Sequence, residues 1–171
     1  KKISIEKQWA TLIDDVKNQG ELYMIIDLLR NDLNSIEKPV AKVLKKKAMV
    51  KVPGLIHQMG VIKAVFSKRI TIGKIVRSLF PGGSITGAPK KSTVQILRKL
   101  EHSPRGVYTG STMLVDSERV CCSINIRTAE VDLEKKELSY GAGGGITLMS
   151  DWESEFVEMQ EKVESFIQSL T

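Results

Sequence analysis

Apolar residues recur with a helical period over the first part of the chain. They fall at helical spacing from Ile5 to Val16, and after Gly20 the same spacing continues to about Asn34. A single internal glycine is tolerated in a helix, so we predict one long or kinked helix over this stretch, with Glu21 near its middle.

The middle of the chain alternates between short apolar runs and turn residues, a pattern that predicts short strands and helices. Thr71 is a suitable cap for a helix that runs to about Leu79, and another helix is predicted from about Pro89 to Leu100. The predicted strands are Lys47–Val52, Val61–Ile70, Val107–Val115, Arg119–Leu133, Glu137–Gly141 and Ile146–Leu148, with hairpin turns at 116–118 and 134–136.

A final helix is predicted where apolar residues form a single stripe at helical spacing. The stripe consists of Trp152, Phe156, Met159, Val163, Phe166, Ile167 and Leu170. Glu155, Glu158 and Lys162 stand at i, i+3 and i+7 along its border, so they form one line from which acids can reach a cleft. The alternative is a surface ion pair between Glu158 and Lys162, which is common on helices.

Length and composition indicate a single globular domain with a hydrophobic core, because the chain has 171 residues, of which 42% are hydrophobic and 27% charged. It contains no apolar run of membrane-spanning length and no signal peptide, so we expect no membrane association. Cys121 and Cys122 are adjacent in a predicted strand, so they are expected to be buried, to point to opposite faces and not to bridge each other. Their spacing suits no metal site, and a reducing, cytoplasmic setting is the default.

The net charge of +6 does not by itself predict nucleic-acid binding. Much of the excess lies in Lys42, Lys45, Lys46, Lys47 and Lys51, next to β-branched residues, which is typical of a solvated hairpin. No aromatic residues are interleaved with these lysines, so a stacking platform for nucleic acid is not expected. A positive field would equally well attract a small polyanionic substrate.

The most distinctive loop is Phe80–Lys90, with the sequence Phe-Pro-Gly-Gly-Ser-Ile-Thr-Gly-Ala-Pro-Lys. Its glycines permit positive φ and close approach by a ligand, Thr86 supplies a hydroxyl, and backbone N–H groups before a helix favour an anion. The alternatives are a plain connection between helices and a nucleotide phosphate loop. The phosphate-loop pattern fails, because Ala88 stands where that motif requires lysine.

A second glycine-rich segment, Gly141–Ile146, lies between two predicted strands. It does not fit the dinucleotide fingerprint, because Ile146 takes the place of the last glycine and no helix opens there. A turn or a bulge is the simplest interpretation of this segment alone. Along the chain it follows a helix acid, a histidine, a hydroxyl loop, a tyrosine and a strand arginine. This order suggests that these residues and the segment form one site.

Taken together, these motifs resemble the C-terminal part of chorismate-utilising enzymes. The resemblance rests on four segments in the same order, and the form of the second is most similar to aminodeoxychorismate synthase component I. The segments are Glu21–Leu33, Phe80–Lys90, Ile126–Thr128 and Gly141–Ile146. The resemblance implies an α+β fold with antiparallel sheets packed as a sandwich and flanking helices, of which residues 1–171 would be the later half.

The resemblance also implies the roles of individual residues. Glu21, Glu155 and Glu158 would hold Mg²⁺. This cation takes oxygen ligands and is usually held by one or two protein carboxylates together with substrate oxygens. His57 and Thr86 would be catalytic. The implied substrate-binding residues are Thr86, Tyr108, Arg127, Gly143, Gly144, Gly145 and Lys162.

Three positions depart from the family pattern. Asn18 and Met149 replace acids, and Gly60 replaces the serine that usually follows the histidine, which weakens the expected metal affinity. The family's nucleophilic lysine and general-acid glutamate belong to segments before Glu21 that this chain does not contain, so we expect these residues alone to bind poorly and not to catalyse. The open sheet surface of such a half is expected to favour self-association.

The implied reaction replaces the C4 hydroxyl of chorismate by ammonia and serves para-aminobenzoate and folate synthesis. A glutamine amidotransferase subunit would supply the ammonia. Two alternatives stay open. One is another chorismate-utilising enzyme such as anthranilate synthase component I, and the other is a non-catalytic binding or scaffold piece.

Overall fold

The computed structural model describes residues 4–38, 40–52 and 55–170. The chain divides into two compact units, Lys1–Lys91 and Ser92–Thr171, where the sequence predicted one globular domain. The predicted α+β class is confirmed, since both units combine helices with antiparallel strand pairs. Among the described residues, the apolar side chains buried to below a tenth of their area are those of Ile26 and Ile36, so the core is small.

The N-terminal helical stretch is two helices, α1 (Ile5–Asp14) and α2 (Val16–Ile36), and not the single helix that the apolar spacing predicts. The break falls at Asp15, which leaves helical geometry with ψ 114°. Its Oδ1 accepts a hydrogen bond from the backbone N–H of Asn18 at 2.7 Å. A carboxylate that caps the next helix in this way competes with continuation of the previous one. Gly20 lies inside α2, as expected.

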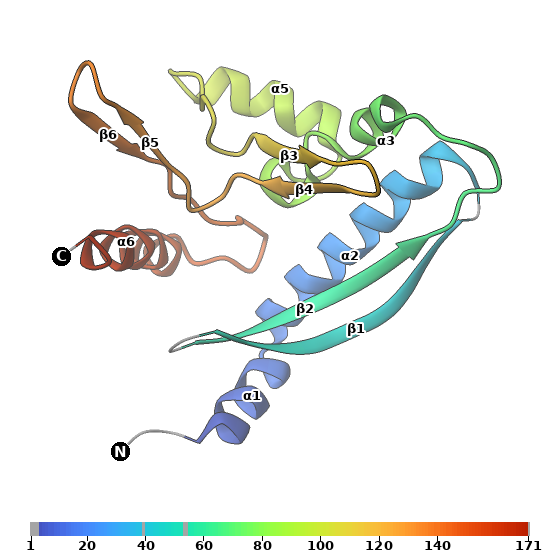
Figure 1. Ribbon diagram of the computed structural model, residues 1–171. Helices are drawn as coiled ribbons and strands as arrows, with labels where there is room; N and C mark the ends of the chain where they lie inside the picture. Colours follow the sequence, from blue (N-terminus) through green and yellow to red (C-terminus); the bar gives the residue numbers. More distant parts are fainter. Residues whose placement is uncertain (1–3, 39, 53–54, 171) are drawn as a thin grey trace. The chain divides into compact units, whose positions relative to one another are not determined.

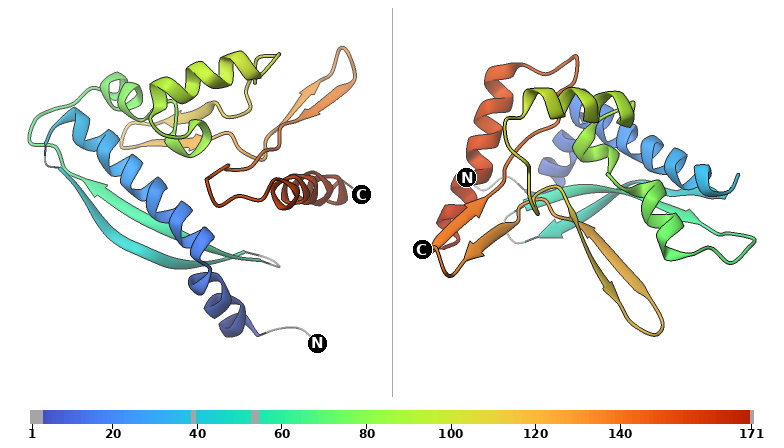
Figure 2. Two further views of the ribbon diagram at one scale, coloured as in Figure 1. Left: turned by 180° about the vertical axis from the view of Figure 1, so that it is seen from behind. Right: turned by 90° about the horizontal axis from the view of Figure 1, so that it is seen from above.

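In the first unit, α2 lies along a long antiparallel hairpin of β1 (Ala41–Val52) and β2 (Leu55–Ala64), as Figures 1 and 2 show. The packing is close at Gly60, where an added Cβ would lie only 2.5 Å from Cδ1 of Ile26. This contact explains glycine here. The strands differ from the prediction in extent, because β1 begins six residues earlier than expected and residues 65–70 are not strand.

The lysine-rich stretch of β1 is a solvated strand, as predicted. The exposed lysines on it are Lys42, Lys45, Lys46, Lys47 and Lys51. Charged side chains on a strand without a second neighbour also discourage pairing with other chains.

The glycine loop connects α3 (Ile72–Leu79) to α5 (Lys90–Leu100) and contains a short helix, α4 (Gly83–Thr86), that the sequence did not predict. The start of α3 was predicted correctly, because the Thr71 hydroxyl accepts from the N–H of Lys74 at 3.3 Å. Of the three glycines expected to use positive φ, only Gly87 does, at 89°. Gly82 is extended and Gly83 is helical and buried.

The second unit contains two further antiparallel hairpins and a long helix. The hairpins are β3 (Ser111–Val115) with β4 (Val120–Ile124), and β5 (Ala129–Asp132) with β6 (Glu137–Tyr140). The helix is α6 (Trp152–Gln168), which is capped by Asp151 through the N–H of Ser154 at 2.9 Å.

Three strand predictions in the second unit were wrong in detail. The predicted strand Val107–Val115 begins only at Ser111, because residues 106–109 form a turn. The predicted strand Arg119–Leu133 is divided into β4 and β5 by a bend at Arg127, whose φ is 52°. The predicted strand Ile146–Leu148 does not form. Instead, Ser150 Oγ accepts from the N–H of Thr147 at 3.0 Å and closes a turn.

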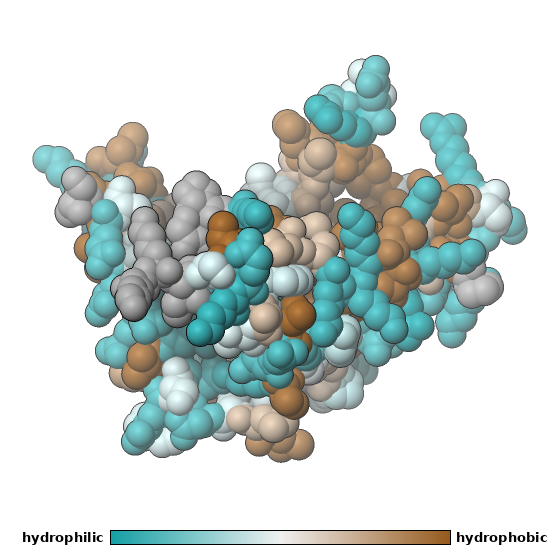
Figure 3. Space-filling model, turned by 90° about the horizontal axis from the view of Figure 1, so that it is seen from below, coloured by the Kyte–Doolittle hydropathy of each residue, from teal (hydrophilic) through white to brown (hydrophobic). Residues whose placement is uncertain are grey.

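Many apolar side chains are exposed, including much of the predicted stripe on α6, such as Trp152 at 73%. In the space-filling view of Figure 3, brown apolar residues reach the surface between teal polar ones. The prediction that Cys121 and Cys122 are buried was wrong. Both are exposed, because all residues of the two-stranded β3–β4 sheet are open to solvent. No helix within the described residues is long and apolar enough to cross a membrane.

Candidate functional site

The second glycine segment lies against the ring of Tyr108. A methyl group at Gly141 would lie 2.2 Å from Cγ of Tyr108, and one at Gly143 would lie 3.0 Å from its hydroxyl oxygen. A real Cβ does not approach another atom as closely as it would at Gly141, so the backbone there follows the ring only because glycine has no Cβ. The glycines of this segment therefore permit a close approach, and the segment is more than a turn between strands.

The middle of this segment also contacts the charged line on α6. Nζ of Lys162 donates to the carbonyl oxygen of Gly143 at 3.1 Å and lies 2.8 Å from Oε1 of Glu158. Glu155 is 7% exposed, and a methyl group at Gly144 would lie 3.2 Å from its Oε2. The Glu158–Lys162 ion pair, which was the alternative interpretation of this line, exists, but Lys162 also donates to the glycine segment, so the pair is not merely a surface contact.

The second unit thus brings together six of the residues that the sequence singled out. They are Tyr108, Gly143, Gly144, Glu155, Glu158 and Lys162. Stacking of Tyr140 on Phe166, with ring centroids 4.0 Å apart and planes within 1°, joins β6 to α6 beside them. Gly145 has no atom within 4 Å of the position that a methyl group would take, so this end of the segment is open.

Arg127 lies at the bend between β4 and β5 with its side chain exposed. Its placement depends on Asn125, which is 8% exposed and which the sequence reasoning did not identify. Asn125 Oδ1 accepts from the Thr112 hydroxyl at 2.9 Å, and its Nδ2 donates to the carbonyl oxygen of Val107 at 3.3 Å. Asn125 therefore connects the bend at Arg127 to the residues beside Tyr108. The only signal in the sequence is one amide between two isoleucines.

The segment before Tyr108 is held by an ion pair between Arg105 and Glu101. Arg105 Nε lies 2.8 Å from Glu101 Oε2, and its Nη2 lies 2.5 Å from Oε1. These hydrogen bonds lower the pKa of Glu101 and raise that of Arg105. Gly106 follows with φ 63°, and the N–H of Val107 donates to Glu130 at 3.1 Å. The start of β5 thus helps to position Tyr108.

The first unit holds the other predicted residues, Glu21, His57 and Thr86. The Thr86 hydroxyl donates to the carbonyl oxygen of Gly82 at 2.9 Å, within the glycine loop. Glu21 is half-buried on α2, and His57 is exposed on β2.

Glu21 and His57 do not belong to one face of the first unit. Gln58 faces α2, since its Oε1 accepts from Gln19 Nε2 at 2.6 Å, and Gly60 faces Ile26 of the same helix. Side chains alternate along a strand, so His57 points to the sheet face opposite α2.

Two of the three predicted metal ligands, Glu155 and Glu158, lie on the same helix, α6. Within the described residues, no cluster of three or more His, Cys, Asp or Glu side chains is close enough to form a metal site. Mg²⁺ does not require one, because it commonly takes one or two protein carboxylates and fills its octahedron with water and substrate oxygens. Glu155 and Glu158, one turn apart and supplying only oxygen ligands, fit that requirement.

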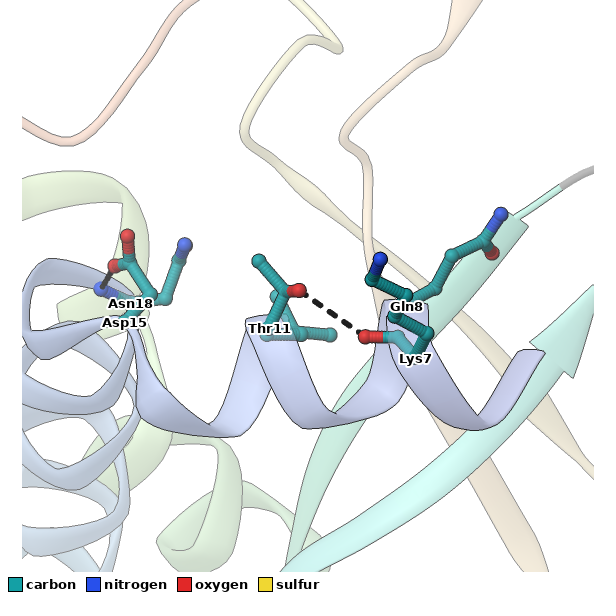
Figure 4. Close-up of a pocket in the computed structure, with 6 residues that line it drawn as sticks. Lys7, Gln8, Thr11, Asp15 and Asn18 are labelled. Carbon is teal, nitrogen blue, oxygen red and sulfur yellow. Dashed lines mark hydrogen bonds between the residues drawn. The ribbon is translucent and has the colours of Figure 1, made fainter. Parts of the chain in front are cut away.

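A hollow of about 330 Å³ lies along α1 and the start of α2 (Figure 4). Its lining consists of Lys7, Gln8, Thr11, Leu12, Asp15 and Asn18. The dashed contacts in Figure 4 are local to the helices: the Thr11 hydroxyl donates to the carbonyl of Lys7 at 3.0 Å, and Asp15 caps Asn18. These polar groups serve helix geometry, and none of the predicted site residues is among them.

Comparison with known proteins agrees with the resemblance. The sequence profile described as "chorismate binding enzyme" matches residues 4–168. The chain is 40% identical over 144 residues to aminodeoxychorismate synthase of Arabidopsis thaliana, covering 84% of this chain and 16% of that protein. It is 33% identical over 168 residues to aminodeoxychorismate synthase component 1 of Escherichia coli, covering 96% and 36%.

Among solved structures, anthranilate synthase component I from Streptococcus pneumoniae superposes with a TM-score of 0.80 at 29% identity. The match covers 94% of this chain and 37% of that one. The chain spans less than half the length of each of these relatives. It has the chorismate-binding α+β fold, and it belongs to the chorismate binding enzyme family.

Proposed function

We propose that this chain is the C-terminal part of an aminodeoxychorismate synthase component I. The reaction joins chorismate and ammonia to give 4-amino-4-deoxychorismate and water, for para-aminobenzoate and folate synthesis. The observation that carries the proposal is the glycine segment fixed between Tyr108 and the Glu155–Glu158–Lys162 line of α6. Relatives bearing this enzyme's name support the branch.

The substrate is a dicarboxylate, and the residues divide into groups suited to it. We assign Arg127 and Tyr108 to the enolpyruvyl carboxylate, because a guanidinium fork matches a planar carboxylate and a phenol donates one further hydrogen bond. Lys162 donates to the carbonyl oxygen of Gly143. On the family resemblance, we assign the backbone of Gly143–Gly145 to the substrate as well. On the family resemblance, His57 and Thr86 are assigned to the reacting ring, with Thr86 also binding substrate; in the first unit His57 lies on the sheet face opposite α2, whereas the loop of Thr86 packs on α2.

We assign Glu155 and Glu158 to Mg²⁺. Glu21, in the first unit, is assigned to the metal on the family resemblance alone. When bound, the ion would position the ring carboxylate and neutralise charge as the hydroxyl departs. Lys162 beside Glu158 keeps that carboxylate oriented and offsets its charge in the metal-free site.

The proposal includes a partner and a setting. Ammonia would come from a glutamine amidotransferase subunit, in the cytoplasm. The chain spans 36% of the Escherichia coli component 1, so we expect turnover from the full-length protein and not from these 171 residues alone.

The test is an assay of the full-length protein with chorismate, ammonia and Mg²⁺, with products identified by mass spectrometry. We expect aminodeoxychorismate, and a loss of rate of about a hundredfold or more in Glu158→Gln but not in Glu161→Gln, an exposed glutamate on the same helix. Anthranilate as the product would select the second candidate, which the match to anthranilate synthase component I favours. No product and no chorismate binding would favour a non-catalytic scaffold.

A further inference from the structure

Lys90 is outside the residues assigned above, yet its side chain joins three parts of the first unit. Its Nζ lies 2.5 Å from Oδ2 of Asp32 on α2, and 3.4 Å from the carbonyl oxygens of both Ser78 and Leu79. The side chains of Lys90 and Asp32 are only 22% and 19% exposed. An ion pair shielded to this extent is screened less by water and salt than one on the open surface.

The carbonyls that Lys90 contacts belong to the C-terminal end of α3, where backbone oxygens have no partner within the helix. A cation at this position satisfies them and interacts favourably with the helix dipole. The same end is joined to α2 by Ser78, whose hydroxyl donates to the carbonyl of Asp32 and shares a hydrogen bond of 2.8 Å with the Ser35 hydroxyl. Asp32 of α2 therefore contacts both the end of α3, through Ser78, and the start of α5, through Lys90.

These contacts close the glycine loop at its base, because Leu79 and Lys90 are the residues at its two ends. Inside the loop, α4 packs on α2: a methyl group at Gly83 would lie 2.9 Å from Cδ1 of Leu28. The Thr86 hydroxyl then donates to Gly82. The position of Thr86 therefore depends on both the closed base and the packing of α4.

We propose that Asp32 and Lys90 are positioning residues that hold the glycine loop closed and thereby set the affinity for substrate at Thr86. Neither residue is assigned contact with the reacting atoms. The role in affinity rests on the proposed function, whereas closure of the loop is a property of the first unit alone. Two different measurements test the closure of the loop and the role in affinity separately.

The first measurement is amide hydrogen exchange in the full-length protein without substrate. The N–H groups of Ile85 and Gly87 donate to Gly82 and Gly83 at 3.2 and 2.8 Å, so they report whether α4 is formed. We expect exchange of both to accelerate about tenfold or more in Lys90→Met, and to stay unchanged in Lys91→Met, the exposed neighbouring lysine. Unchanged exchange in Lys90→Met would overturn the closure.

The second measurement is steady-state kinetics with chorismate. We expect KM to rise about tenfold in Lys90→Met and in Asp32→Asn with kcat little changed, and the double variant to be no worse than either single one. Lys90→Arg, which keeps the charge and several donors, should recover part of the affinity and guards against misfolding of the methionine variant.

Additive effects in the double variant, or a fall in kcat with KM unchanged, would overturn the role in affinity. A parent protein that binds no chorismate would overturn the proposed function and with it the role in affinity. The exchange measurement would still decide whether Asp32 and Lys90 close the loop.

Discussion

Glycine carries much of the information at the scale of single residues, because adjacent glycines have very different surroundings. Gly141 is in contact with the Tyr108 ring and Gly144 with Glu155, whereas Gly145 faces open space. The sequence identified the segment but not which of its glycines are in close contact, because that depends on a tyrosine more than thirty residues away. Asn125, Asp32 and Lys90 were missed for the same reason, as their partners are distant in sequence.

Gly141→Ala should displace the Tyr108 ring, because the new methyl group would overlap it. We expect chorismate affinity in the full-length protein to fall about tenfold or more, measured by calorimetry. Gly145→Ala is the matched control and should bind normally, because no atom lies within 4 Å of the added carbon. Equal affinities for both variants would show that contact with Tyr108 is not needed for binding.

Gly60→Ser should destabilise the first unit, although the family resemblance implies serine at this position. The added carbon would meet Cγ1 of buried Ile26 at 2.6 Å, and such overpacking typically costs about 1–3 kcal/mol. Gly20→Ala, at an exposed position in the second turn of α2, should instead stabilise by about 1 kcal/mol. Urea denaturation measures both, and a neutral Gly60→Ser would mean that Ile26 can move aside without cost.

The elements that the sequence predicted best are those whose ends are set locally. Thr71 and Asp151 begin α3 and α6 through their own side chains, so their neighbours in sequence suffice to place them. The short helix α4 was missed because glycine and threonine are weak helix formers, and it forms where Gly83 packs on Leu28. The cysteines of β4 were expected to be buried, but burial depends on a second layer that a two-stranded hairpin lacks.

Both hairpins of the second unit turn around an aspartate whose carboxylate accepts backbone N–H bonds. The pKa of Asp116 is lowered first by the N–H groups of Glu118 and Arg119, and the pKa of Asp132 first by the N–H of Lys135. A lowered pKa in the folded state means that the stabilisation is present above the ordinary value and is lost as pH falls through the lowered one.

We therefore expect both carboxyls to titrate below about 3.9, the ordinary value for aspartate, and the two turns to loosen only in that acid range. Carboxyl carbon shifts followed by NMR against pH measure this directly. Midpoints at or above the ordinary value would contradict the hydrogen bonds assigned to these turns.

At the scale of the whole molecule, the main feature is apolar surface that this chain does not cover. Leu114 on β3 is 68% exposed, and Trp152 on α6 is 73% exposed. The sequence predicted open sheet surface for this half of the fold, and the exposed β3–β4 hairpin agrees. The placement of His57 opposite α2 could not be predicted, because it depends on which face of β2 the helix covers.

We expect the isolated 171-residue chain to bind hydrophobic dyes and to self-associate, because many of its large apolar side chains are exposed and burying them is favourable. Analytical ultracentrifugation with dye fluorescence tests this, with the full-length protein as the control. A monomeric chain that is silent to the dye and melts cooperatively would contradict the prediction.

The most direct test of the central claim is calorimetric titration of chorismate into the full-length protein, with and without Mg²⁺. The account predicts Mg²⁺-dependent binding that is lost in Glu158→Ala and retained in Glu161→Ala, since Glu158, unlike Glu161, lies in the line with Lys162 and the glycine segment. Binding that is independent of Mg²⁺, or equally strong in Glu158→Ala, would contradict the assignment of this line on α6 to the metal and its substrate.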